Sequence, residues 1–223
     1  MGKNVTGVGR PRASGAAASS QNAREAVLEA AGELFTGAGY AATTTRAIAE
    51  RAGLRQASLY YHFPSKEDIL AALLAATVRP SLEVAGGLSG GDAPAAVRLW
   101  ALAYADIRLL GGARYNLGAL YLLPEIASPN LAPFRAEREQ LKAVYRDLVA
   151  ESGAPSGSGS DVAVRSNLVF GLVESIAIVR RDDPVLDVEA HAVEGADGVL
   201  RVAGLPAPDA TLRAAARALL TRS

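Results

Sequence analysis

Hydrophobic residues recur at helical spacing from Gln21 onward, beginning with a stripe that defines one face of an amphipathic helix. The stripe follows an i, i+4, i+7, i+8, i+11 pattern through Ala23, Val27, Ala30, Ala31 and Leu34. Gly37 and Gly39 come directly after it, and glycine commonly ends a helix. The pattern therefore predicts a first helix that starts near Gln21 and ends at these glycines.

Two shorter helices are predicted after this one. Threonines at 43–45 offer an N-cap for a helix that reaches about residue 52, and Gly53 breaks it. The next helix covers about residues 56–62 and ends before Pro64, because the residue that precedes a proline avoids helical backbone. The N-terminal part of the chain is therefore expected to be a unit of three helices.

The remainder of the chain alternates helical stretches with breaks rich in glycine, proline and serine. Ser65 and Asp68 form a capping-box-like start for a helix whose core face would contain Ile69, Leu70, Leu73, Leu74 and Thr77. Further helical stretches are predicted at about 95–110, 113–123, 131–150, 161–181, 187–203 and 209–221. No alternating strand pattern with turn residues occurs, so the expected fold class is all-α.

The two short helices meet the packing demands of a helix-turn-helix. Ala49 is small enough to sit where the helices cross, Gly53 can adopt the positive φ that the turn needs, and Leu59 can insert into the core. The outward positions carry side chains that can donate a hydrogen bond or a positive charge to DNA: Arg46, Arg55, Gln56, Ser58, Tyr60, Tyr61 and His62. This spacing predicts a DNA-binding unit.

Short motifs follow one another in a specific order between Ala23 and Leu70. A Gly-Tyr pair, a threonine run, Ile-Ala, Ala-Gly, Leu-Tyr-Tyr-His-Phe and Lys-Glu-Asp all lie within GYAATTTRAIAERAGLRQASLYYHFPSKEDIL. This run resembles the N-terminal domain of the tetracycline-repressor (TetR) family of bacterial regulators. The resemblance implies a homodimer that binds double-stranded operator DNA and a small effector, with repression as the expected action.

The candidate DNA-binding residues fall into two groups. We expect base-edge contacts from Arg46, Gln56 and Tyr60. Contacts to phosphate are expected from Thr45, Ser58, Tyr61, His62 and Lys66, and Thr44 and Arg55 complete the set. The tyrosines could instead be core aromatics, but residues 60 and 61 lie about 100° apart on a helix, so at least one should point outward. Phe63 is expected in the core.

Charge is distributed unevenly along a chain whose formal net charge is zero. Residues 1–66 hold eight basic and four acidic side chains, which leaves the other residues with 15 basic and 19 acidic ones. A basic N-terminal part suggests a polyanion as its partner. We interpret residues 1–20 as a disordered basic arm, residues 21–66 as the DNA-binding domain and residues 67–223 as the effector-binding and dimerisation domain.

Several classes of protein fit the sequence poorly. There are no cysteines and only two histidines, and no metal-ligand cluster, nucleophile elbow or phosphate-binding glycine loop is present, so we expect no catalytic residue, metal or cofactor. The chain contains no apolar run of 18 residues and no signal-peptide core, so a cytoplasmic protein with no membrane partner is expected. Two rivals remain: an activator or co-repressor-type regulator on the same fold, and a helical ligand-binding protein or enzyme with a vestigial helix-turn-helix.

The C-terminal part offers candidates for an effector pocket. Trp100, Tyr104 and Ile107 share one helical face, although such a stripe is also typical of a core. The candidate ligand-binding residues are Trp100, Tyr104, Tyr115, Tyr121, Glu125, Tyr145, Asn167, Phe170 and Glu174. Aromatic side chains dominate this set and basic residues are dispersed, so a small, mainly apolar effector is expected and a polyphosphate is not.

Dimerisation is assigned to two late helices. The stretch 161–181 is apolar on most sides, and such a helix must be buried by more than one neighbour. The stretch 209–221 carries a second apolar face. We therefore expect both stretches to contribute to a twofold interface, with Val173 as a position at which a charge would split the dimer.

Overall fold

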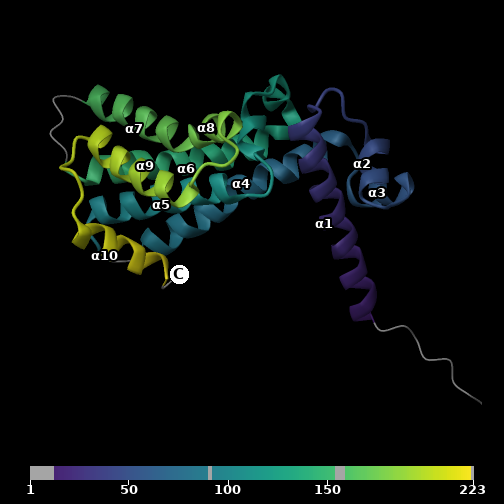
Figure 1. Ribbon diagram of the computed structural model, residues 1–223, viewed down its shortest axis with the longest axis horizontal. Helices are drawn as coiled ribbons and strands as arrows, with labels where there is room; N and C mark the ends of the chain where they lie inside the picture. The colour runs from purple at the N-terminus through teal and green to yellow at the C-terminus, as the bar shows by residue number, and fades with distance from the viewer. Residues whose placement is uncertain (1–12, 90–91, 154–158, 222–223) are drawn as a thin grey trace, which may run out of the picture. The chain divides into compact units, whose positions relative to one another are not determined.

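The computed structural model describes residues 13–89, 92–153 and 159–221, and these residues form helices with no strand among them (Figure 1). The predicted all-α fold class is confirmed. The chain divides into two compact units after Ile69, close to the expected domain boundary at residue 66.

The N-terminal unit contains three helices: α1 (Ala13–Gly37), α2 (Thr45–Arg51) and α3 (Gln56–His62). Val27, Ala30 and Ala31 of the predicted α1 stripe are buried, together with Ile48 and Leu59 from the two short helices. Phe63 is also buried, as expected, and lies beneath the guanidinium of Arg24. The hydrophobic pattern therefore identified part of this core: Ala23 and Leu34 of the stripe are only half-buried, and the buried Phe35 and Tyr40 were not in it.

Helix α1 starts earlier than the sequence suggested. Residues 13–20 were expected to be disordered, but α1 begins at Ala13. This segment is rich in alanine, the residue with the highest intrinsic helix propensity, so it extends the helix although it lacks an apolar stripe. The basic residues Lys3, Arg10 and Arg12 of the expected arm lie outside the described residues.

Local capping interactions fix the short helices. The Thr44 hydroxyl accepts a hydrogen bond from the amide of Ala47, which makes Thr44 the N-cap of α2. Gly53 has a φ of +68°, the left-handed conformation that the turn between α2 and α3 requires. The Ser65 hydroxyl accepts from the amide of Asp68, as the capping-box pattern predicted.

The C-terminal unit is a bundle around a central helix. Its elements are α4 (Lys66–Ser89, whose first residues belong to the N-terminal unit), α5 (Ala95–Gly112), η1 (Leu117–Leu122), η2 (Pro124–Ala127), η3 (Pro129–Leu131), α6 (Ala132–Glu151), α7 (Gly159–Glu174), α8 (Ile176–Asp182), α9 (Val188–Ala203) and α10 (Ala210–Leu220). Eleven of the 18 residues of α5 are buried. Helices α6, α7, α8, α9 and α10 all contact α5, which makes it the core of this unit.

Two predicted helices have a different form. The stretch 113–123 is not one α-helix, because its helical part is the 3₁₀ segment η1. Arg180 donates to the carbonyls of Leu110, Ala113 and Tyr115, so carbonyls at the end of α5 are bonded to a side chain instead of a continuing helix. The stretch 161–181 is divided at Ser175. The Ser175 amide is shared between the carbonyls of Gly171 and Leu172, and its hydroxyl donates to the same Leu172 carbonyl.

Two described segments are long and apolar enough to cross a membrane by length and composition alone. They are Lys66–Ser89 and Asp161–Asp182, and 50% and 33% of their apolar windows are buried inside the structure. Core helices of water-soluble proteins pass the same test, so this observation is weak support for a membrane segment. The low burial of the second segment shows that much of its apolar surface faces outward.

A buried carboxyl group links three helices of the bundle. Asp106 on α5 accepts hydrogen bonds from the Ser81 hydroxyl on α4 and from the Tyr145 hydroxyl on α6, the latter at 3.0 Å. Burial raises the pKa of Asp106 to about 6, against the two hydrogen bonds, and the nearby negative charge of Glu174 acts in the same direction as burial. Ionised Asp106 is thus stabilised by hydroxyl groups alone among the described residues.

We predict that Asp106→Asn changes the pH dependence of stability. Between pH 3.8 and about 6 the folded protein binds more protons at Asp106 than the unfolded chain, so the unfolding free energy of the wild type falls as pH rises through this window. One pKa unit corresponds to about 1.4 kcal/mol, so the difference between 3.8 and about 6 predicts a fall in the unfolding free energy of about 3 kcal/mol. Urea unfolding from pH 3.5 to 7 should show the variant gaining this amount relative to wild type. Parallel pH profiles would contradict the assignment.

Candidate functional site

Helices α2 and α3 present a polar surface to solvent. Arg46, Arg55, Gln56 and Ser58 are all exposed, and Tyr61 is 83% exposed. Thr44 and Tyr60 are exposed as well, while Thr45 and His62 are partly exposed. Both tyrosines point outward, where at least one was expected. Nine of the ten predicted DNA-binding side chains therefore lie on a surface that a ligand can reach without unfolding the unit.

Hydrogen bonds order the side chains of this surface. The hydroxyls of Thr45 and Tyr60 lie 3.0 Å apart, and the Gln56 amide donates to the Thr45 hydroxyl at 3.3 Å. These bonds connect α2 to α3 across the exposed face. Arg46 pairs with Glu50 one turn along α2 at 2.9 Å. An exposed ion pair of this kind contributes little to stability, so the Arg46 guanidinium can exchange Glu50 for a phosphate or a base at little cost.

Lys66 differs from the other nine candidates. Its ammonium donates to the carbonyls of Tyr40 at 2.9 Å and Thr43 at 3.0 Å, and it lies 4.1 Å from the centroid of the Tyr40 ring. This group therefore holds the turn between α1 and α2. A substitution at Lys66 would disturb the turn as well as any phosphate contact, which makes Lys66 a poor probe of DNA binding.

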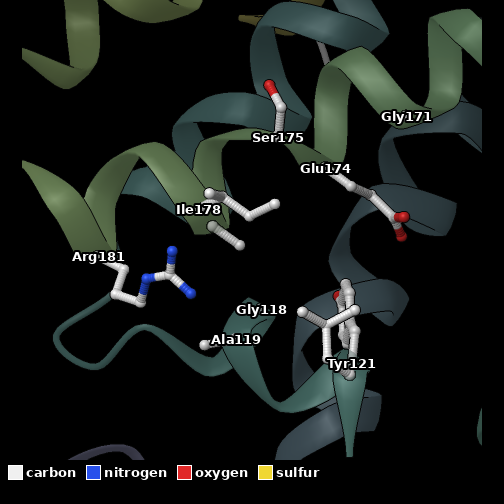
Figure 2. Close-up of a pocket in the computed structure, with 10 residues that line it drawn as sticks. Gly118, Ala119, Tyr121, Gly171, Glu174, Ser175, Ile178 and Arg181 are labelled. Atoms are coloured by element: carbon white, nitrogen blue, oxygen red, sulfur yellow. The ribbon is translucent and has the colours of Figure 1, made fainter.

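A cavity of about 240 Å³ opens between η1, α7 and α8 (Figure 2). Its wall is built mainly from small and apolar residues: Gly118, Ala119, Leu122, Gly171, Ala177 and Ile178. Four polar side chains complete it: Tyr121, Glu174, Ser175 and Arg181. Among the predicted ligand-binding residues, Tyr121 and Glu174 line this cavity.

Most polar groups of the cavity are already bonded. The Tyr121 hydroxyl lies 2.5 Å from the Thr77 hydroxyl, and burial raises the pKa of Tyr121 well above its usual range. Glu174 accepts from the Arg138 guanidinium at 2.7 Å, and this guanidinium also lies over the Phe170 ring. These contacts fix the inner wall of the cavity in one arrangement.

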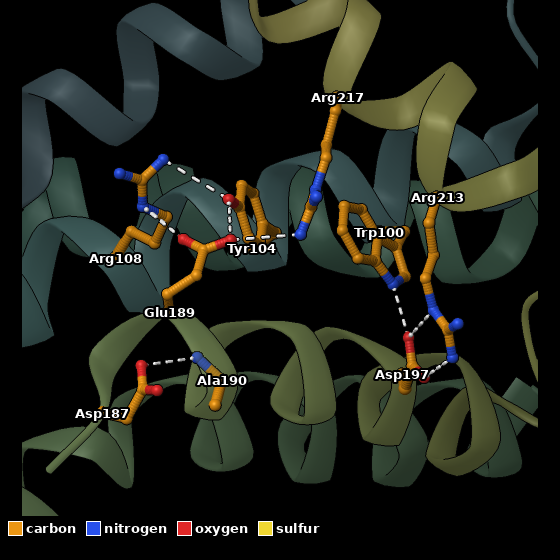
Figure 3. A network of polar contacts seen from close by, with 9 residues as sticks. All are labelled: Trp100, Tyr104, Arg108, Asp187, Glu189, Ala190, Asp197, Arg213 and Arg217. Carbon is orange, nitrogen blue, oxygen red and sulfur yellow. Dashed lines mark hydrogen bonds and ion pairs between the residues drawn. The ribbon is translucent and has the colours of Figure 1, made fainter. Parts of the chain in front are cut away.

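Trp100 and Tyr104 lie on another side of the bundle, in two matching clusters (Figure 3). The indole of Trp100 donates to Asp197 at 2.8 Å, and the Tyr104 hydroxyl donates to Glu189 at 2.7 Å. The same two carboxylates of α9 also receive arginines from α10: Arg213 bonds to Asp197, and Arg217 bonds to Glu189. Each cluster joins α5, α9 and α10, so Trp100 is a packing residue between helices and not a wall of the cavity.

The other predicted ligand-binding residues are dispersed. Tyr145 and Phe170 are buried against each other in the core, with ring centroids 5.6 Å apart. Asn167 is exposed, and Tyr115 lies partly exposed beneath the guanidinium of Arg114. Glu125 lies on η2, a different 3₁₀ segment from the η1 segment that carries Tyr121. None of these five residues lines the η1–α7–α8 cavity.

Sequence reasoning missed Arg181, Arg138 and Asp197. Arg181 and Arg138 looked like ordinary surface arginines because periodicity does not show which helix lies opposite. Asp197 did carry a signal, because it interrupts the apolar face of α9 formed by Ala192, Ala196, Val199, Leu200 and Ala203. A charged residue on a buried face requires a partner, which here is Arg213.

Comparisons with known proteins agree with this architecture. Residues 27–73 match the family described as "Bacterial regulatory proteins, tetR family". The tetracycline repressor protein class C of Escherichia coli is 48% identical over 50 residues, which are 22% of this chain and 23% of that protein. The repressor KstR2 of Mycobacterium tuberculosis is 47% identical over 51 residues, 23% of this chain and 26% of that protein. The chain thus spans about a quarter of the length of these curated relatives.

A solved structure extends the similarity over nearly the whole chain. Mycobacterium smegmatis AmtR has 46% sequence identity and a TM-score of 0.81, with 89% of this chain and 94% of AmtR covered. The chain belongs to the TetR family. A TetR-family regulator from Bordetella parapertussis, at 22% identity, 81% and 95% coverage and a TM-score of 0.69, shares the fold.

Membership of the TetR family defines the class of protein: a DNA-binding transcriptional regulator and not an enzyme. The predicted family and the predicted helix-turn-helix are confirmed. The individual DNA-contacting residues stay predictions that rest on the exposed α2–α3 surface. Of the candidate ligand residues, only Tyr121 and Glu174 are carried forward as part of the cavity.

Proposed function

We propose that this TetR-family protein is a repressor that binds a palindromic operator as a homodimer and releases it when a small effector occupies the η1–α7–α8 cavity. The exposed polar surface of α2 and α3 carries the DNA-binding part of this proposal. Two curated relatives are named repressors, which favours repression over activation. An activator on the same fold would be distinguished by an operator that lies upstream of the promoter. Action on DNA also favours a cytoplasmic location.

Helix α3 is proposed to enter the major groove. Gln56 and Tyr60 are on its outward side, and Arg46 of α2 lies on the same unit, so these three side chains are proposed to contact base edges. The hydroxyl and imidazole groups around them are proposed to contact phosphate: Thr44, Thr45, Ser58, Tyr61 and His62. In a dimer, two copies of α3 would enter successive major grooves about 34–36 Å apart.

The proposed dimer forms through α7. Val164 and Leu168 lie one turn apart on this helix and are 57% and 58% exposed, which is unusual for large apolar side chains in a monomer. Helix α10 was also expected at the interface, but its one buried residue, Ala216, lies in a helix that contacts α5 of the same chain. Val173 is fully buried inside the bundle, so the interface is better probed at Leu168.

The effector is proposed to act by linkage. A ligand that binds the DNA-released state more tightly than the DNA-bound state shifts the equilibrium by that difference in affinity. The cavity is enclosed by two segments that are far apart in the sequence, η1 and α7–α8, so a bound molecule would fix their separation. A small change in the C-terminal unit could then alter the spacing of the two α3 helices in the dimer.

We predict that Gln56→Ala relaxes base preference at one position of each half-site. Loss of a bidentate contact to a base costs about 1–3 kcal/mol of discrimination. Gln140→Ala is the matched control, because it removes the same kind of side chain at an exposed position of α6, in the C-terminal unit. Binding to a library of operator variants measures the preference. An unchanged preference in Gln56→Ala would contradict base reading by this residue.

We predict that Leu168→Glu separates the dimer into folded monomers, because a carboxylate at the interface would be buried without a partner. Val173→Glu places the same charge in the monomer core and should instead lower the melting temperature sharply. Sedimentation together with thermal unfolding distinguishes the two effects. A wild type that is monomeric at micromolar concentration would refute the proposed interface.

A further inference from the structure

The charged groups of the η1–α7–α8 cavity differ in how strongly they are already paired. Glu174 meets two of the three guanidinium nitrogens of Arg138, with Nε donating to one oxygen at 2.7 Å and Nη2 to the other at 2.5 Å. This bidentate geometry is the strongest form of the Arg–carboxylate pair, and both side chains are largely shielded from solvent. Glu174 therefore has its charge neutralised and both oxygens occupied.

Arg181 is in the opposite situation. Arg181 pairs with the adjacent Asp182 at 2.9 Å, and the two side chains are 62% and 65% exposed. An exposed pair of this kind contributes little to stability, so the Arg181 guanidinium can change partner at little cost. Figure 2 shows the guanidinium of Arg181 pointing into the cavity from α8, toward Ala119 and Gly118, while the carboxylate of Glu174 is turned away from it. The cavity thus offers one available charge, and that charge is positive.

The walls determine what else a ligand must have. Gly118 is packed against α8 so closely that a Cβ at this position would lie 2.7 Å from the Cβ of Ala177. This side of the cavity is therefore a smooth, close-packed apolar surface. Gly171 faces open space, since a Cβ there would meet no atom within 4 Å. The free volume beside Gly171 can take an apolar body, and about 240 Å³ is slightly below the roughly 300–1,000 Å³ typical of ligand pockets, so the body must be compact.

We infer that the effector is a small organic monoanion, a carboxylate on a compact apolar body, with its charged group on Arg181 and its body against Gly118, Ala177 and Gly171. This inference rests on the proposed function, because it specifies the chemistry of the proposed effector site. A cationic ligand would have to displace Arg138 from both oxygens of Glu174. A ligand with several negative charges would find one available cation among the lining residues that the structure describes.

Three probes with the same phenyl group and similar size test the charge preference: 3-phenylpropanoate, 3-phenylpropanamide and 3-phenylpropylamine. Calorimetric titration into the full chain without DNA should show the carboxylate binding at least about tenfold more tightly than the amide, which corresponds to about 1.4 kcal/mol. Arg181→Gln should remove this preference, and Arg181→Lys should retain part of it. Gly171→Leu, which fills the open space, should abolish binding of all three probes.

Arg146→Gln is the matched control. Arg146 forms the same kind of exposed pair with its neighbour Asp147, with the side chains 57% and 63% exposed, but it lies on α6 and does not line the cavity. This variant should keep the wild-type preference for the carboxylate. Circular dichroism melting of every variant confirms that the fold is intact, and Arg181→Lys serves as the informative variant if Arg181→Gln is unfolded.

Equal or tighter binding of the amide or the amine to wild type would overturn the inference. An absence of carboxylate binding at about 10 mM would also overturn it. A preference that survives in Arg181→Gln would overturn the assignment to Arg181. Operator binding by wild type without probe is measured separately. If wild type binds DNA but shows no preference among the three probes, this inference alone is refuted. If wild type binds no DNA, the proposed function is refuted.

Discussion

The DNA-binding unit depends on the burial of a single leucine. Helix α3 has seven residues, and Leu59 is the one that is buried. A helix this short is not stable by itself, because nucleation costs more than a single turn of hydrogen bonds returns. Insertion of Leu59 into the core with Val27 and Ile48 therefore supplies the stability of α3. The same constraint leaves the other side chains of α3 free for recognition.

The left-handed turn completes this arrangement. Gly53 adopts the left-handed backbone of the turn between α2 and α3, and the small Ala49 of α2 is buried in the core of the unit. The turn brings Thr45 next to Tyr60 and Gln56, so the outward side chains are hydrogen-bonded to one another before DNA arrives. A surface ordered in this way loses less side-chain entropy on binding. Ala49, Gly53 and Leu59 thus determine both the packing of the two helices and the surface that is proposed to recognise DNA.

Local chemistry explains which features could be predicted from the sequence. The caps at Thr44 and Ser65 and the turn at Gly53 depend on residues within a few positions, so short motifs identified them. The pocket could not be found in this way. Periodicity shows that Trp100 is on a buried face, but its partner Asp197 is 97 residues away, and only the tertiary structure shows that they meet. Tyr121 and Glu174 were two of nine candidates, and the other seven do not line this cavity, so the sequence alone did not distinguish the pair.

Three buried or half-buried carboxylates organise the C-terminal unit, and each is stabilised differently. Asp106 relies on two hydroxyl groups, Asp197 on an indole and arginines, and Glu174 on a bidentate arginine. In Asp197, burial opposes ionisation, but the hydrogen bonds from Arg213 and Trp100 outweigh it and lower the pKa. The positive groups that balance these carboxylates are consequently engaged inside the bundle. Arg181 stays available because its own partner, Asp182, is exposed.

The central claim, that two α3 helices read a symmetric operator, is tested most directly by selecting bound fragments from the genomic DNA of the source organism. The account predicts enrichment of fragments with two inverted half-sites whose centres lie about 10–10.5 base pairs apart, or a multiple of this distance. The affinity of the selected fragments should fall as salt concentration rises, because phosphate contacts release counterions. Failure to enrich any sequence, or enrichment of a single site without twofold symmetry, would contradict the account.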